Sequence, residues 1–122
     1  MKGLIIKEPW IDHILDDEKA WEIRGRGTKI RGTIALIKSG TGLVLGLVDV
    51  VDSLELTPDA FYQAEAQHRI PNPATRPLPY PRIYAWVLAH PKRLLVPQPY
   101  VHPQGAIIWV NLPEDMDLTR AV

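Results

Sequence analysis

The first hydrophobic pattern in the chain is that of a helix. Pro9 stands at a plausible first helical position, because the N–H that proline lacks would be unpaired there in any case. The apolar residues behind it recur at the spacing of one helix face, namely Trp10, Ile11, Ile14 and Leu15. The pattern stops at the acidic run 16–18, so the helix is expected to end there.

Five later segments have the hydrophobic pattern of strands. In the first, residues 21–24, apolar and charged side chains alternate, so Glu22 and Arg24 share one face. The other four are short β-prone runs at residues 34–37, 43–51, 84–89 and 106–110. A glycine inside a strand, as at Gly46, favours a bulge or a barrel bend.

A second helix is expected after residue 56. Thr57 has the side chain of an N-cap, Pro58 suits the first helical position, and the helix is expected to run to about His68. The proline cluster that follows, at residues 71–81, predicts an extended loop, because proline lacks an N–H and fixes φ near the polyproline value. Such a loop acts either as a lid or as a tie across the surface, and the pattern leaves both open.

Several strands, glycine corners and two helices predict an α+β fold. We expect an antiparallel, partly closed β-barrel of about five or six strands with two main helices at its ends. A parallel doubly wound sheet would need more crossover helices than the chain supplies. With 122 residues the chain fits a single domain over residues 1–122, with a frayed tail at 113–122.

Composition narrows the classes of function. The 14 Lys and Arg balance 14 Asp and Glu, so a nucleic-acid site must be local rather than spread over a polycationic surface. The absence of cysteine excludes disulfides, cysteine-ligated zinc and thiol catalysis, and it fits the cytoplasm. No apolar run approaches the roughly 20 residues of a membrane span, so no membrane partner is expected.

The histidines do not have the spacing of a metal site. Neither HxH nor HExxH occurs, and no metal or other cofactor is expected. Two of the four histidines precede proline, and His90-Pro91 and His102-Pro103 are read as strand ends.

Lys19, Glu22 and Arg24 form a Lys-x-x-Glu-x-Arg motif directly after the first helix. This motif resembles the signature of ASCH domains (activating signal cointegrator homology). The similarity continues, over roughly residues 4 to 112, through residues 32–37, 39–42, the strand with Gly46, 84–88 and 105–109. The resemblance implies a PUA-like β-barrel, a cleft where the three motif side chains converge, and an association with RNA or modified nucleotides.

One branch of that family consists of amidohydrolases that remove the acyl group from N4-acetylcytidine, with threonine at the position of Glu22. A hydroxyl can attack a carbonyl and form an ester, whereas a carboxylate would have to form a mixed anhydride or activate water. Some other ASCH proteins are ribonucleases, and many have no assigned activity. The resemblance thus implies a binding function or one of two hydrolytic activities.

The three motif residues each have an ordinary structural interpretation as well. Lys19 follows three acidic residues, and on this pattern it is an exposed lysine in a turn. In a functional role, it donates a hydrogen bond to an oxyanion or phosphate, or acts as a base after desolvation. Glu22 and Arg24 can form a plain ion pair. In a functional role, Glu22 accepts a hydrogen bond from a base edge or orients water, and Arg24 binds a phosphate with its planar guanidinium. Strand alternation groups Lys19 with Trp21, opposite Glu22, so convergence requires the strand to begin after Lys19.

Residues 38–42 raise the question of a phosphate-binding loop. They lack the order Gly-Lys-Ser/Thr and open no helix, so a hairpin turn is favoured. Ser39, Gly40 and Thr41 of this turn stay candidate contacts to a ligand in the cleft.

The four tryptophans divide into core and candidate ligand contacts. Trp21 and Trp86 stand at alternating strand positions and are expected to be mostly buried. Trp10 and Trp109 stay open as platforms on which a base could stack.

Three hypotheses of function follow. The first is a binding module that holds single-stranded RNA or a modified nucleoside with Lys19, Glu22, Arg24 and loop 39–41. The second is a hydrolase of the same fold, a ribonuclease or a nucleoside amidohydrolase, with Lys19 and Glu22 as catalytic candidates. The third is a protein-interaction module that uses loop 71–81, for which no protein partner is identified.

Overall fold

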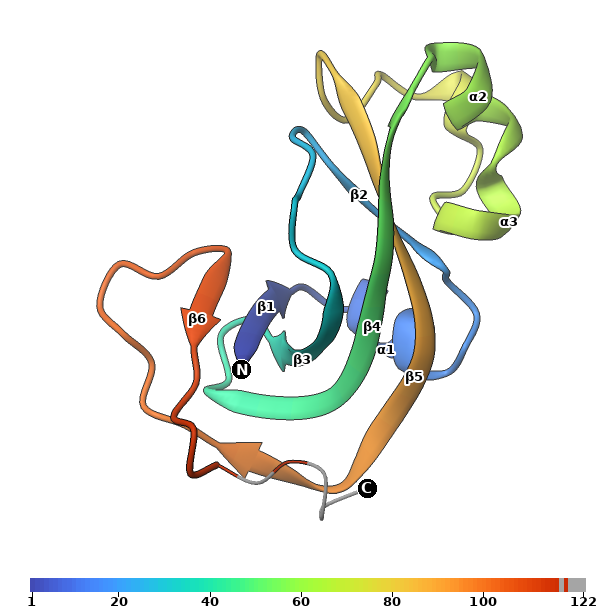
Figure 1. The fold of residues 1–122 in the computed structure, drawn as a ribbon. Coiled ribbons are helices and arrows are strands. Elements are labelled where there is room, and N and C mark those ends of the chain that lie inside the picture. Colours follow the sequence, from blue (N-terminus) through green and yellow to red (C-terminus); the bar gives the residue numbers. More distant parts are fainter. Residues whose placement is uncertain (117, 119–122) are drawn as a thin grey trace.

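The computed structural model describes residues 1–116 and 118 and shows a strongly curled six-stranded sheet (Figure 1). The strand order is β2-β5-β4-β3-β1-β6. The strands are β1 (Lys2–Ile6), β2 (Trp21–Arg24), β3 (Gly32–Lys38), β4 (Leu43–Leu56), β5 (Ile83–Pro99) and β6 (Trp109–Asn111). The helices are α1 (Trp10–Leu15), α2 (Pro58–Gln63) and α3 (Glu65–His68), with a 3-10 turn η1 (Pro73–Thr75).

The sheet curls because its two longest strands, β4 and β5, bend together along their length (Figure 1). Their register shifts at three places, and bulges of this kind bend and twist a strand pair. At one of them Gly46 lies under Leu15 of α1, and a Cβ at residue 46 would come 2.6 Å from the Lys92 carbonyl oxygen. The bend predicted at Gly46 is confirmed, and the missing side chain lets α1 approach the sheet closely.

The predicted α+β class is confirmed, the curled sheet is not closed into a barrel, and its topology differs from the prediction in one strand. Strand β1 was not predicted, and it pairs in parallel with β3, with Leu4 opposite Leu36, whereas the other neighbouring strands pair antiparallel. The sheet is therefore mixed. Residues 2–6 form only a short apolar run, and such a run has no periodicity that distinguishes a strand from other buried segments.

Helix and strand limits differ from the predicted ones at several places: the strands predicted at 43–51 and 106–110 are Leu43–Leu56 and Trp109–Asn111. Pro9 is the N-cap of α1 rather than its first residue. Thr57 caps α2 as predicted, accepting from the Ala60 N–H at 3.1 Å, but the helix predicted to run to His68 breaks at Ala64 into α2 and α3. The prediction that a strand ends at His90-Pro91 is wrong, because these residues form a bulge inside β5, with φ of 55° at His90.

Three hydrophobic clusters hold the fold together. One lies between α1 and the middle of the sheet, one joins β3 and β4 to the far half of β5, and one packs α2 onto β2 and the start of β5. Leu118, in the segment predicted to fray, is 2% exposed and belongs to the second cluster. Residues 117 and 119–122 of that predicted tail lie outside the described residues.

Candidate functional site

The connection between α1 and β2 places Lys19 beside Glu22. The backbone N–H groups of Glu18 and Lys19 both donate to the carbonyl oxygen of His13, at 2.8 and 3.0 Å, and this closes a tight turn after α1. Strand β2 begins only at Trp21. The condition for convergence of the motif is therefore met, because Lys19 precedes the strand and is not bound by its alternation.

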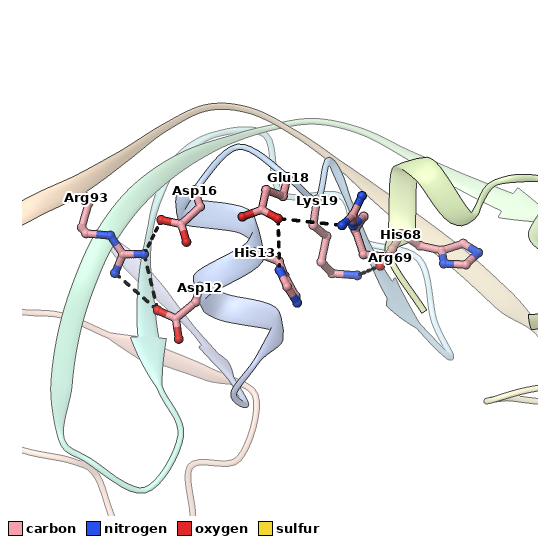
Figure 2. Close-up of polar contacts among 8 residues, drawn as sticks. All are labelled: Asp12, His13, Asp16, Glu18, Lys19, His68, Arg69 and Arg93. Carbon is pink, nitrogen blue, oxygen red and sulfur yellow. Dashed lines mark hydrogen bonds and ion pairs between the residues drawn. The ribbon is translucent and has the colours of Figure 1, made fainter. Parts of the chain in front are cut away.

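The Lys19 side chain is buried and held on several sides. It is 3% exposed, and its Nζ donates to the carbonyl oxygen of His68 at the end of α3 (Figure 2). The same Nζ lies 5.0 Å from the ring centre of Trp10 and 3.8 Å from Oε1 of Glu22. A cation over an aromatic face is stabilised by the ring quadrupole, so the ammonium has an aromatic, a carboxylate and a carbonyl partner.

Burial changes the protonation of Lys19. Desolvation disfavours the ammonium and lowers the pKa of Lys19 from 10.5 to about 8. The negative charge of Glu22 opposes this shift by raising the pKa, and the positive charge of Arg24 adds a smaller lowering. Near pH 8, about half of the molecules would then carry a neutral amine in the site. Lys19 can thus act as a hydrogen-bond donor or, once neutral, as a base.

Glu22 and Arg24 form a tight ion pair on β2. Nη2 and Nε of Arg24 lie 2.8 and 3.0 Å from the same carboxylate oxygen, Oε2 of Glu22. Nη2 also donates to the Ile5 carbonyl oxygen at 3.1 Å, and the guanidinium lies 5.5 Å from the ring centre of Trp86. The ordinary ion pair expected from the sequence is confirmed. It fixes the carboxylate so that its other oxygen, Oε1, faces Lys19.

Contacts between polar and charged side chains at the surface surround the Lys19 turn (Figure 2). Glu18 lies 3.8 Å from both His13 of α1 and Arg69 after α3. Arg93 of β5 reaches two carboxylates of α1, at 3.4 Å to Asp12 and 2.9 Å to Asp16. Each exposed pair contributes little by itself, but together they link α1, α3 and β5 around the buried lysine.

A cleft of about 380 Å³ opens over the motif. Of the residues predicted from the sequence, five line it: Lys19, Glu22, Arg24, Ser39 and Trp10. Its walls combine these residues and Lys7, which was not predicted, with apolar side chains from β1, from the proline loop and from the segment before β6. The motif side chains therefore meet in a concave site, at the edge of the sheet where β2 lies.

Three predicted contacts lie outside the cleft lining. Thr41 closes its own turn, since its hydroxyl donates to the Lys38 carbonyl oxygen at 2.7 Å and accepts from the Leu43 N–H at 3.1 Å. Gly40, exposed in the same turn, has φ of 80°. Trp109 stacks on Trp86 with ring centres 5.7 Å apart.

The remaining tryptophans differ in burial. Trp86 is 4% exposed, as predicted. Trp21, also predicted to be mostly buried, is only half-buried, because β2 is an edge strand of the sheet.

Several lining residues were not predicted from the sequence. Ile70, Pro79 and Tyr80 belong to the loop between α3 and β5, and Ile107 and Ile108 precede β6. The proline cluster was the available signal for the first group, but it indicates a loop and not the surface that the loop covers. The second group gave no signal, because exposed apolar residues in a predicted strand look like core.

Residues 1–116 and 118 contain neither a metal-binding cluster nor a membrane-spanning helix. No three His, Asp or Glu side chains gather there in a group that could hold a metal ion. No helix in this part is both long and apolar enough to cross a membrane.

Comparison with known proteins identifies the fold. The model of the ASCH domain family matches residues 4–98. A crystal structure of ASCH from Zymomonas mobilis superposes with a TM-score of 0.65 at 11% identity, covering 93% of this chain and 87% of that one. Two single-residue variants of the Zymomonas mobilis protein superpose with TM-scores of 0.62 and 0.63 at 12% and 11% identity, again over 93% of this chain, and over 88% and 90% of theirs. No match was found among curated proteins.

Proposed function

Because the chain belongs to the ASCH domain family, whose PUA-like fold is generally linked to RNA binding, we propose that it holds single-stranded RNA or a modified nucleoside in the cleft over Lys19, Glu22 and Arg24. Ser39 of the turn after β3 supplies a further polar contact at the rim. The proposal places the protein in the cytoplasm, a reducing compartment that suits a chain without cysteine.

The observation that carries the proposal is a cation and a carboxylate side by side in a concave site. Nζ of Lys19 has three donor positions in its charged form, and the His68 carbonyl uses one of them. Oε1 of Glu22 lies 3.8 Å away, so a ligand edge with a neighbouring acceptor and donor can bridge the two groups. The Watson–Crick edges of nucleobases have such neighbouring atoms.

Size and charge agree with this class of ligand. A volume of about 380 Å³ lies within the range of about 300 to 1,000 Å³ typical of small-molecule sites. The formal net charge of zero predicts few phosphate contacts, hence modest affinity and a shallow dependence on salt. Recognition would then rest on the base and its immediate surroundings more than on the backbone.

A titration with short single-stranded RNA, structured RNA and N4-acetylcytidine at low salt tests the proposal. We expect the unmodified protein to bind a single-stranded or nucleoside probe and Lys19→Met to weaken that binding at least tenfold, the loss of about 1.4 kcal/mol. Lys92→Met, at an exposed lysine of β5 outside the cleft, is the matched control and should bind like the unmodified protein. A flat titration with all three probes would overturn the proposal.

A second candidate function, hydrolysis, is favoured by the pKa of Lys19 at about 8. A neutral amine in the cleft can take a proton from water, whose oxygen then attacks the acyl carbon of an amide. The charged Arg24 would stabilise the developing oxyanion, and the protonated Lys19 would return the proton to the leaving amine, so that one amide and one water give an acid and an amine.

Product masses separate binding from hydrolysis. The protein and Lys19→Ala are incubated separately with short single-stranded RNA and with N4-acetylcytidine. Product formed only by the unmodified protein supports an enzyme, and its mass distinguishes RNA cleavage from deacylation. Equal turnover by Lys19→Ala would contradict a catalytic role of Lys19.

A further inference from the structure

Aromatic side chains line the cleft at two places in the described part of the chain, Trp10 and Tyr80. The ring of Trp10 is already engaged, since the Lys19 ammonium lies 5.0 Å from its centre. Tyr80 is half-buried, and none of the cation–π contacts among the described residues involves it. Its ring is therefore the aromatic surface of the cleft that no charged group of the site covers.

The loop that carries Tyr80 is anchored. After α3 the chain turns through Arg69 and Asn72, which both have positive φ, and the Asn72 N–H donates to Oε1 of Glu65 at 3.2 Å. Pro73 is buried, and prolines at positions 79 and 81 flank Tyr80 directly. Fixed φ values restrict such a segment, so the ring is held in place before a ligand arrives.

Gly25 provides the seat for the Tyr80 ring. A Cβ at residue 25 would lie 2.9 Å from Cδ1 of Tyr80, closer than such groups approach, and 3.2 Å from Cγ, a tight contact. The phenol ring thus lies directly on the backbone that follows Arg24, and beyond that contact it packs on the cluster around Ile23 and Phe61. A larger residue at position 25 would displace the ring.

We propose that Tyr80 is the stacking surface for the heterocycle of a nucleobase and that Gly25 positions it. The inference rests on the proposed function and specifies it, because a base bound at Lys19 and Glu22 presents a flat face to an aromatic wall of the same cleft. Stacking on an aromatic side chain is tolerant of sequence and is strong for each base. Base identity would then be read by the polar groups, and affinity would depend on Tyr80.

Binding by paired variants tests this inference. The probes are a ten-nucleotide single-stranded RNA, an abasic RNA of the same length, and N4-acetylcytidine. We expect Tyr80→Ala to weaken binding of a base-containing probe about 5- to 150-fold, the range for one base–aromatic stack, and to leave abasic RNA unaffected. Tyr80→Phe keeps the ring and should bind within about twofold of the unmodified protein. Tyr62→Ala is the matched control, since Tyr62 packs on the same cluster outside the cleft.

A double-mutant cycle tests the role of Gly25. Gly25→Ala should weaken binding when Tyr80 is present and have no further effect in Tyr80→Ala, because only the displaced ring connects the two positions. An RNA with one 2-aminopurine adds a direct readout, since stacking quenches its fluorescence. The quenching should persist in Tyr80→Phe and disappear in Tyr80→Ala.

The outcomes separate this inference from the proposed function. Unchanged binding by Tyr80→Ala together with weakened binding by Lys19→Met would overturn the stacking role and leave the proposed function standing. Equal losses in Tyr80→Ala and Tyr62→Ala would also overturn it, because the effect would then come from the cluster. Absence of binding by the unmodified protein would overturn both.

Discussion

Replacing Lys19 with methionine should remove a pH dependence of stability that the buried ammonium creates. The pKa of Lys19 is about 8 in the folded chain, against an ordinary value of 10.5. Between these two pH values the unfolded state binds more protons than the folded state, so the free energy of unfolding rises with pH. One pKa unit corresponds to about 1.4 kcal/mol, which makes the full effect about 3 kcal/mol.

Urea denaturation at pH 7, 9 and 10 measures this effect. The quantity compared is the free energy of unfolding of the unmodified protein minus that of Lys19→Met. Groups that titrate alike in both proteins cancel in this difference. Relative to pH 7, that difference should move in favour of the unmodified protein by about 1 kcal/mol at pH 9 and about 2 to 3 kcal/mol at pH 10. The control Lys92→Met removes an exposed lysine and should follow the unmodified protein at every pH.

A difference that stays constant from pH 7 to 10 would refute the reasoning. It would mean that water reaches Nζ or that the Glu22 carboxylate compensates fully for desolvation. A difference that moves the other way would show that the carboxylate dominates and that the pKa of Lys19 is raised.

Three further substitutions have defined consequences. Arg24→Met leaves the mostly buried Glu22 without its closest partner and should lower the free energy of unfolding by about 3 kcal/mol in urea titrations, with partial recovery when Glu22→Gln is added. Gly46→Ala forces a Cβ to within 2.6 Å of the Lys92 carbonyl oxygen and should cost about 1 to 3 kcal/mol, seen as a lower thermal midpoint. Thr57→Ala removes the cap of α2 and should cost about 1 kcal/mol without changing RNA binding, so a large loss of binding would contradict the placement of the site.

Sequence patterns predicted those parts of the fold whose cause is local. The N-cap at Thr57, the shared strand face of Glu22 and Arg24 and the bend at Gly46 follow from the chemistry of the residues themselves, and the structure confirms all three. Burial along residues 21–24 does not alternate, because Glu22 is buried and Trp21 is half-buried. The parallel pairing of β1 depends on a partner more than 30 residues away, with Gly3 opposite Ala35. No local periodicity encodes such a partner.

The candidate site divides in the same way. A motif within six residues contained Lys19, Glu22 and Arg24, but their convergence depended on where the strand begins. The buried Lys19 ammonium donates to the carbonyl oxygen of His68, which lies 49 positions further along the chain. The acidic residues next to Lys19 in the sequence give no sign of this contact or of the burial. Tyr80 was hidden in a proline cluster for the same reason, since its contact with Gly25 is made only in the folded chain.

The pairing of β1 with β6 bears on the order in which the protein can fold. Lys2 and Asn111 are 109 positions apart, and β1 lies between β3 and β6 in the sheet. Closing so long a loop costs chain entropy, and the contacts that offset this cost form only once the loop has closed. Folding is therefore slow. Ile5 of β1 and Ile108, the residue before β6, both line the cleft, and the Ile5 N–H donates to the Ile108 carbonyl oxygen at 2.9 Å. During synthesis on the ribosome, the binding wall would therefore stay incomplete until residues 108–111 emerge and reach β1.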